Sequence, residues 1–299
     1  MKQFKVGIDL GGTKTEAILL DPDGVELNRE RVPTPRDESV VYQDVLQNVH
    51  RVILDQVKEV PAGREYTIGV GVPGSIHPEN HHIIKSNITT LNGTPFKQDL
   101  ETLLGRTIGM DNDGNCFALA ESRQGAAKAY RFVFGVIMGT GCGGGLCIDG
   151  HIRQGRNGVT GEWGHMSIDP LGIECFCGNR GCIETKISGT GLSKNFTAKY
   201  GLDLTPEQIL EGHAQGEIRC TDIYESFLDD FGRCIGGLIS IIDPDAIVLG
   251  GGLSNIEDLY DVGVEKVRRY SFQPDIDTPV LKNRLGDSAG VLGAAWIGI

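Results

Sequence analysis

The chain has 299 residues, of which 39% are hydrophobic and 23% charged, proportions typical of a folded globular protein with an ample core. Its formal net charge of −12 argues against a nucleic-acid partner, because phosphate backbones select clustered Lys and Arg. No apolar run is long enough to span a bilayer, and Asp9 comes too early for the apolar region of a signal peptide. We therefore expect a cytoplasmic protein with no membrane or nucleic-acid partner.

Strand and helix patterns alternate along the first part of the chain. They predict strands at Lys5–Leu10, Glu16–Leu20, Asn28–Pro33, Thr67–Val72 and Thr107–Met110, and helices at Val40–Val57, Pro95–Leu104 and Asn115–Gly125. The second part predicts a hairpin at 133–150, helices at 187–200, 205–213 and 219–241, a strand at Ala246–Leu249 and a last helix at Ser288–Trp296. We expect an α/β protein with two domains, residues 1–113 with about 286–299, and residues 114–285.

The segment from Asp9 to Thr15 joins two apolar runs and predicts the turn of a glycine-rich hairpin. Gly11 and Gly12 allow backbone N–H groups to approach an anion, and Thr13 and Lys14 add a hydroxyl and an ammonium donor. Asp9 is placed where a magnesium ion could bridge to phosphate oxygens. An ordinary tight turn is the alternative, and a lone Gly-Gly-Thr would favour it.

The pattern recurs in the second part of the chain, which favours phosphate binding. Another apolar run, a Gly/Thr turn and a further apolar run suggest a duplicated α/β unit. Met138 stands where the first copy has Asp9, so only the first copy can supply a carboxylate to a metal. A glycine triplet after the apolar run Ala246–Leu249 suits close approach to a nucleotide. The predicted nucleotide contacts of this part are Gly139, Thr140, Gly141, Cys142, Gly143 and Gly144 with Gly250, Gly251 and Gly252.

Two carboxylates and two amides gather at Asp111–Asn115, at the entry to a predicted helix. Helix capping alone explains one such residue, because Asp and Asn are favoured N-caps. Four polar side chains beside a strand end also fit phosphoryl transfer, which needs an acceptor that aligns a substrate hydroxyl. The helix dipole would keep Asp113 ionised for that role.

Three cysteines cluster at Cys175, Cys177 and Cys182, and His165 precedes them. In a cytosolic chain this set predicts a closed Cys₃His zinc site with a structural ion; a disulfide plus a free thiol is the alternative. A metal that fixes His165 and Cys182 would also fix Glu162 and Glu184. Rigid carboxylates beside a cleft suit contacts to sugar hydroxyls.

Together these motifs resemble the sugar kinases of the ROK family, within the actin/hexokinase-like (ASKHA) fold. The resemblance covers essentially the whole chain and includes the segments Gly71–Gly74, Gly161–His165 and Leu249–Gly252. It implies two duplicated α/β domains that flank a nucleotide and sugar cleft. It further implies ATP, Mg²⁺ and a structural Zn²⁺, a hexose as the other substrate, and a homodimer.

The resemblance also assigns roles to individual residues. Asp113 is implied as the catalytic base, and Mg²⁺ would be held near Asp9. The implied sugar contacts are Asn112, Asp113, Glu162, His165 and Glu184, and the implied zinc ligands are His165, Cys175, Cys177 and Cys182. His165 thus has two roles, one for each ring nitrogen.

The branch of the family decides the expected substrate. Three segments resemble bacterial fructokinases that also accept mannose: Leu91-Asn92-Gly93-Thr94-Pro95-Phe96, Gly139–Gly143 and Cys182–Thr185. We expect transfer of the ATP γ-phosphoryl group to the 6-hydroxyl of fructose, with mannose and glucose as weaker substrates. The alternatives are an N-acetylglucosamine kinase of the same family, a non-catalytic sugar sensor and a sugar-nucleotide-processing fragment.

Overall fold

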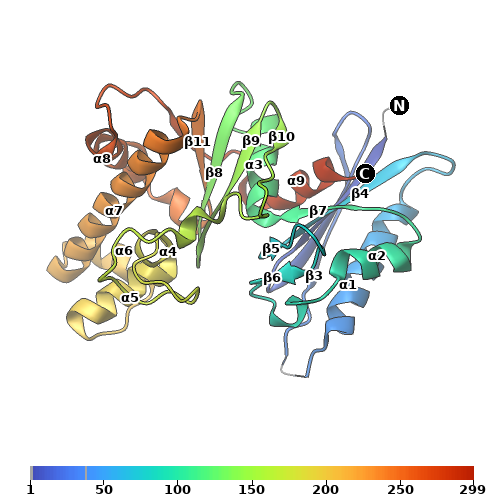
Figure 1. Cartoon of the computed structure of the whole chain (residues 1–299), viewed down its shortest axis with the longest axis horizontal. Coiled ribbons are helices and arrows are strands. Elements are labelled where there is room, and N and C mark those ends of the chain that lie inside the picture. The colour runs from blue at the N-terminus through green and yellow to red at the C-terminus, as the bar shows by residue number, and fades with distance from the viewer. Residues whose placement is uncertain (1–2, 38) are drawn as a thin grey trace. The chain divides into compact units, whose positions relative to one another are not determined.

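The computed structural model describes residues 3–37 and 39–299, which form two compact units (Figure 1). The first unit contains Met1–Ala120, Ile152–Thr160 and Asp287–Ile299; the second contains Glu121–His151 and Gly161–Gly286. The division after Ala120 falls inside a helix, a few residues beyond the boundary expected near residues 112–114. Residues 152–160 return to the first unit, which the sequence pattern does not predict.

The first unit is built on a five-stranded sheet in the order β3-β2-β1-β4-β7. Its strands are β1 (Phe4–Leu10), β2 (Lys14–Leu20), β3 (Glu26–Pro33), β4 (Tyr66–Val72) and β7 (Gly109–Asn112). Its other elements are α1 (Tyr42–Lys58), α2 (Phe96–Leu104), most of α3 (Asp113–Arg123), α9 (Ala289–Ile297), the 3₁₀ turn Thr89–Leu91 and the short pair β5 (Ser75–Ile76) and β6 (Ile83–Ile84). β1 pairs antiparallel with β2 and parallel with β4.

The second unit repeats this arrangement with a sheet in the order β10-β9-β8-β11-β12. Its strands are β8 (Phe132–Met138), β9 (Cys142–Ile148), β10 (His151–Ile152), β11 (Ala246–Gly250) and β12 (Val280–Lys282). Its helices are α4 (Glu184–Ile187), α5 (Gly189–Tyr200), α6 (Pro206–Ala214), α7 (Ile218–Ile242) and α8 (Val262–Tyr270). β8 pairs antiparallel with β9 and parallel with β11, as β1 does with β2 and β4. The predicted α/β duplication is confirmed.

Helix α1 shows how the sequence specifies these elements. Asp44 accepts a hydrogen bond from the backbone N–H of Val41 at 2.9 Å and so closes the start of the helix. Val45, Val49 and Ile53 are fully buried at steps of four, as their spacing predicts. The sequence pattern misses α8 and β12, because α8 buries little apolar surface and β12 has three residues at a sheet edge. No helix in the described part of the chain is long and apolar enough to cross a membrane.

Helix α9 lies directly on the sheet of the first unit because three glycines stand side by side there. The strand register pairs Gly7 with Gly69 and Gly69 with Gly109. A Cβ atom on Gly69 would lie 1.9 Å from the carbonyl oxygen of Ala294, and one on Gly109 would lie 1.9 Å from that of Ile297. Only residues without a Cβ allow backbones this close. Apolar residues of α1 and α2 fill the larger core of the same unit.

We expect Gly69→Ala to destabilise the protein by roughly 3 kcal/mol, because the new methyl group must push α9 off the sheet. Urea unfolding followed by circular dichroism measures the change. Gly237→Ala is the matched control, since, apart from the nearby backbone of α7 itself, no atom of the described residues lies within 4 Å of its Cβ position. Alanine there should leave stability unchanged or raise it by up to about 1 kcal/mol. Equal stability of the two variants would contradict this account of the glycine row.

Candidate active site

The turn between β1 and β2 is a tight hairpin turn at the predicted position. Gly11 donates its N–H to the carbonyl oxygen of Lys14 at 3.0 Å, which closes the turn. Thr13 and Lys14 are exposed at its tip. Behind the turn, the Thr34 hydroxyl donates to the carbonyl oxygen of Gly11 at 2.7 Å and lies 2.9 Å from the Thr15 hydroxyl. The donors at the tip are therefore held on a supported backbone.

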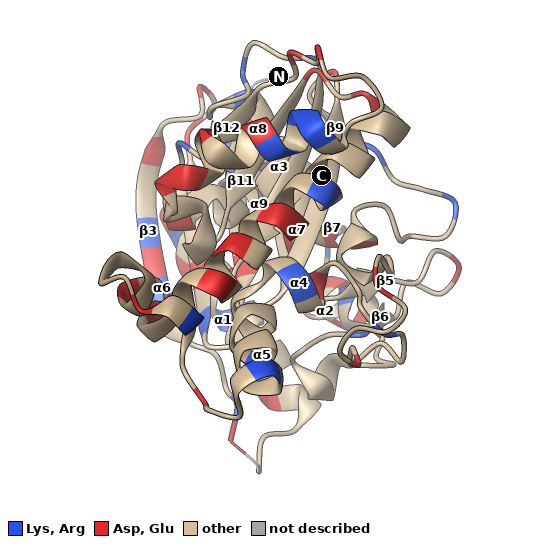
Figure 2. Ribbon diagram, turned by 90° about the vertical axis from the view of Figure 1, so that its left-hand side faces the viewer, with Lys and Arg blue, Asp and Glu red and all other residues tan. Residues whose placement is uncertain are grey.

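A buried carboxylate, Glu16, lies two residues beyond the turn. Its side chain is only 1% exposed and pairs with Arg29 of β3, with Arg31 at 3.0 Å and with Lys14 at 3.8 Å. Acidic and basic residues alternate along β3 (Figure 2), and its arginines compensate this burial. The ion pair with Glu16 thus restrains the Lys14 side chain. Glu16 is not among the site residues predicted from the sequence, although a single Glu inside an apolar strand is a signal that could have identified it.

Asp9 lies at the end of β1, close to the first turn of α9. A Cβ atom on Gly290 would lie 2.6 Å from Asp9 Oδ2, so that glycine makes room for the carboxylate. Burial, together with the nearby charges of Asp113 and Glu16 and against the opposing charge of Lys14, raises the pKa of Asp9 to about 7. A carboxylate in this setting is stabilised when a cation binds beside it.

We expect Asp9→Asn to stabilise the protein in metal-chelated buffer above about pH 7. The unfolded pKa is near 3.8 and the folded value near 7, so between these values the native state holds a proton that the unfolded state has lost. The free energy of unfolding of the wild type therefore falls as pH rises through this window. The variant does not show this fall, because asparagine does not titrate.

Urea unfolding of both proteins, with EDTA, at about pH 4, 6 and 8 measures the effect. The advantage of the variant should be on the order of 1 kcal/mol or more at the highest pH and should vanish at the lowest. A difference that is independent of pH would contradict the proposed titration of Asp9.

Asn112, not Asp113, caps helix α3. Its Oδ1 accepts hydrogen bonds from the backbone N–H groups of Gly114 at 2.7 Å and Asn115 at 3.3 Å. Its Nδ2 donates to the carbonyl oxygen of Gly74 at 2.8 Å. Asp113 occupies the first turn of the helix, where its Oδ1 accepts from the N–H of Gly114 at 2.8 Å. The N-cap position therefore does not account for Asp113, and within the described residues the Asn112 amide donates only one of its two N–H groups.

Asp111 is a structural residue of the same cluster. It is 7% exposed, and its Oδ1 accepts from Asn115 Nδ2 at 2.8 Å and from its neighbour's backbone N–H. Its Oδ2 accepts from Gln154 Nε2 at 2.9 Å. This last bond holds residues 152–160 to the first unit. Because Gln154 is 43 residues away, no local pattern reveals the contact.

The second hairpin and the glycine triplet lie side by side in the second unit. Gly139 donates its N–H to the carbonyl oxygen of Gly141 at 3.0 Å and closes the turn between β8 and β9. Gly251 has a φ of 79°, and a Cβ there would lie 2.4 Å from the carbonyl oxygen of Met138. Met138, which stands where the first copy has Asp9, is fully buried and has no carboxylate to offer. Gly144 is buried against Gly135 and Trp163, which assigns it to packing and does not support the nucleotide contact predicted for it.

The segment Gly161–His165 packs closely on β9. A Cβ on Gly161 would lie 2.3 Å from the carbonyl oxygen of Gly144, and one on Gly164 would lie 1.9 Å from that of Cys142. Trp163 Nε1 donates to the carbonyl oxygen of Gly143 at 2.9 Å. These contacts fix the positions of Glu162 and His165 beside the second hairpin.

The four predicted metal ligands meet at one point of the second unit. Their ligand atoms all lie within 4.8 Å of one another, with His165 Nδ1 3.6 Å from Cys175 Sγ and Cys177 Sγ 3.6 Å from Cys182 Sγ. Zn–S bonds of about 2.3 Å in a tetrahedron place sulfurs about 3.8 Å apart, so the set fits zinc. His165 turns its other nitrogen, Nε2, toward Glu162 Oε2 at 4.0 Å.

The predicted residues thus form two groups, one in each unit. The first unit brings together Asp9, Asn112, Asp113 and the Gly11–Lys14 turn. The second unit holds the rest: the Gly139–Cys142 turn, the Gly250–Gly252 triplet, the Cys₃His cluster, Glu162 and Glu184.

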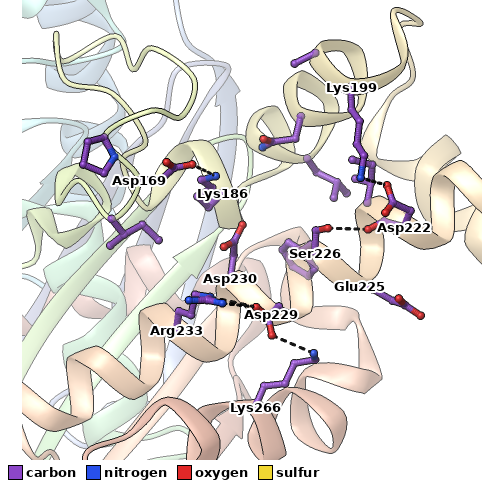
Figure 3. A pocket seen from close by; sticks show the side chains of 17 residues that line it. Asp169, Lys186, Lys199, Asp222, Glu225, Ser226, Asp229, Asp230, Arg233 and Lys266 are labelled. Atoms are coloured by element: carbon purple, nitrogen blue, oxygen red, sulfur yellow. Dashed lines mark hydrogen bonds and ion pairs between the residues drawn. The ribbon is translucent and has the colours of Figure 1, made fainter.

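A cavity of about 900 Å³ lies elsewhere in the second unit, among α4, α5, α7 and α8 (Figure 3). Several of its charged residues pair with one another, as in Lys186–Asp169 at 2.7 Å and Lys266–Asp229 at 3.3 Å. Neither the glycine turns nor the metal-ligating cysteines line it. It is therefore separate from the candidate site.

Comparison with known proteins finds relatives along the whole chain. A profile of the ROK family matches residues 5–299. The N-acetyl-D-glucosamine kinase of Yersinia pseudotuberculosis is 36% identical over 97% of both chains. The enzyme of the same name from Photobacterium profundum is 36% identical over 98% of both chains.

Solved structures agree with this result. A ROK hexokinase from Thermus thermophilus has a TM-score of 0.90 at 30% identity, over 99% of this chain and 98% of that one. A ROK family glucokinase from Streptomyces griseus, solved with glucose and AMPPNP, has a TM-score of 0.79 at 28% identity, over 99% of each chain. The class that this fold and site define is that of the hexokinase-like sugar kinases. Within that class, the chain belongs to the ROK family. The fructokinase branch is not supported by these relatives.

Proposed function

We propose that the protein transfers the γ-phosphoryl group of ATP to the 6-hydroxyl of N-acetylglucosamine. The observation that carries this proposal is the 36% identity, over nearly the full length of both chains, to N-acetyl-D-glucosamine kinases. The expected fructose specificity has weaker support, and fructose is retained as the competing substrate.

Three of the residues that favoured fructose, Leu91, Asn92 and Gly93, have structural roles in the loop before α2. Leu91 is fully buried in the core of the first unit. The Asn92 amide closes the loop, since its Oδ1 accepts from the N–H of Ser86 at 2.8 Å and its Nδ2 donates to the carbonyl oxygen of Ser86 at 3.0 Å. Gly93 has a φ of 77°. These contacts explain the three residues without reference to a substrate.

The chemistry follows from the groups of the first unit. Asp113 would accept the proton of the attacking hydroxyl, while the Gly11–Lys14 turn would bind phosphate oxygens. Mg²⁺ beside Asp9 would supply neutralisation of the phosphate charge. We assign the sugar contacts to Asn112 and Asp113 together with Glu162, His165 and Glu184 of the second unit.

A panel of hexoses with Mg-ATP, followed by ADP release, tests the assignment. We expect kcat/KM for N-acetylglucosamine to exceed that for fructose by roughly ten-fold or more, because sites that hydrogen-bond a substrate group discriminate strongly against analogues that lack it. A higher kcat/KM for fructose would instead support the hypothesis that the protein is a fructokinase.

Asp113→Asn tests the mechanism in the same assay. Kcat should fall by about 10²–10⁴-fold with the fold intact, since an amide cannot take the hydroxyl proton. Asp111→Asn is the control: it removes a buried acceptor, so it should lower the unfolding temperature while costing much less of kcat. Equal activity losses in the two variants would contradict the base assignment.

We further propose that the Cys₃His cluster holds one structural zinc ion. The support is geometric: four ligand atoms of suitable type lie within 4.8 Å of one another, beside residues assigned to the sugar. All four tetrahedral positions are taken by protein, so the ion would organise the loop and take no part in the reaction.

Elemental analysis of protein prepared without added metal should find one zinc per chain. Cys177→Ser should reduce that content and lower the unfolding temperature, because structural zinc contributes folding free energy. Cys147→Ser, outside the cluster, is the control for cysteine loss and should keep its zinc. Zinc-free wild-type protein with unchanged stability would refute the proposal.

A further inference from the structure

A short segment after the cysteine loop, residues 184–190, is hydrogen-bonded to the turn of the second hairpin, Gly139–Cys142. The backbone N–H of Cys142 donates to Glu184 Oε2 at 3.0 Å. Gly189 donates its N–H to the carbonyl oxygen of Gly139 at 2.8 Å, and Thr190 donates to that of Thr140 at 3.2 Å. Every residue of the turn except Gly141 is thus bonded to this segment.

Gly141 contributes a close approach instead of a hydrogen bond. A Cβ atom on Gly141 would lie 2.5 Å from Glu184 Oε2 and 3.5 Å from its Cδ. Leaving out the chain neighbours of Gly141, no other atom of the described residues comes within 4 Å of that position. Because Gly141 has no side chain, the Glu184 carboxylate can pack directly against the turn.

The second carboxylate oxygen of Glu184 lies near the cysteine loop. Its Oε1 lies 3.9 Å from Cys175 Sγ, a member of the Cys₃His cluster. One side chain therefore contacts both the cysteine loop and the turn of the second hairpin. A carboxylate is suited to this, because hydrogen bonds from backbone N–H groups to an ionised acceptor are stronger than neutral ones.

We propose that Glu184 is a positioning residue for nucleotide binding, which fixes the Gly139–Cys142 turn in the conformation that receives ATP. This goes beyond its assignment to the sugar, and it rests on the proposed function only in that the turn binds nucleotide. It follows that the order of the cysteine loop and the affinity for ATP are linked through one carboxylate.

Calorimetric titration of the sugar-free protein with Mg-AMPPNP tests the proposal. Without sugar present, a contact between Glu184 and the sugar cannot contribute to the measured affinity. Glu184→Ala should weaken binding by roughly ten-fold, the effect of losing one hydrogen bond to a charged acceptor. Glu184→Gln keeps an acceptor oxygen and should bind within about two-fold of wild type. Glu174→Ala removes an exposed carboxylate from the cysteine loop and should bind like wild type.

A double-mutant cycle isolates the contact from the hairpin side. Gly141→Ala changes no metal ligand, and it should weaken AMPPNP by a similar factor because its methyl group displaces the Glu184 carboxylate. In the Glu184→Ala background that methyl group has room, so Gly141→Ala should add less than about two-fold. Fully additive losses, or normal binding by Glu184→Ala, would overturn the proposal.

Two checks separate this inference from the proposed function. Wild-type protein that fails to bind Mg-AMPPNP contradicts the proposed nucleotide site; wild-type binding with unaffected Glu184→Ala contradicts the positioning role alone. If Glu184→Ala does not fold, Gly141→Ala and Glu184→Gln decide, and wild-type affinity in Gly141→Ala refutes the proposal. Zinc content and thermal unfolding are measured for each variant.

Discussion

Direct contact between backbones, made at glycines, is the constraint on which this structure depends. In the first unit, Gly69 and its two neighbours across the sheet bring α9 onto the strands. In the second unit, Gly161 and Gly164 seat a segment on β9, and Gly251 approaches Met138. Because backbone has fewer degrees of freedom than side chains, groups carried by such contacts keep their positions. Close packing of backbones thus accounts for part of the high glycine content.

The acidic groups of the first unit differ in how their charge is compensated. Glu16 is buried among basic side chains, and Asp111 is saturated by amide and backbone donors. Asp9 is buried and lies near other carboxylates, and both its burial and these neighbouring charges raise its pKa. Among these three acids, Asp9 is therefore the one at which a bound cation would relieve an electrostatic cost, which agrees with the magnesium site proposed there.

Local patterns in the sequence predicted the duplicated α/β units, the glycine turns and the Cys₃His cluster, because each depends on residues that are close along the chain. Contacts between distant residues were not predictable in this way. The bond from Gln154 to Asp111 and the pairing of Arg29 with Glu16 have no local signature. Leu91 and Asn92 are weak evidence for a substrate, because similarity within a family does not separate residues that build a loop from residues that select a sugar.

The position of α9 in the chain has a consequence for biosynthesis. This helix covers strands that all lie within the first 112 residues, yet it is itself formed by residues 289–297. During translation the glycine-bearing face of that sheet remains without its cover until the second unit has been synthesised. The first unit therefore completes its packing only after residues 289–297 have been synthesised, and until then α9 is not available to cover this face. Early chaperone contacts are expected there.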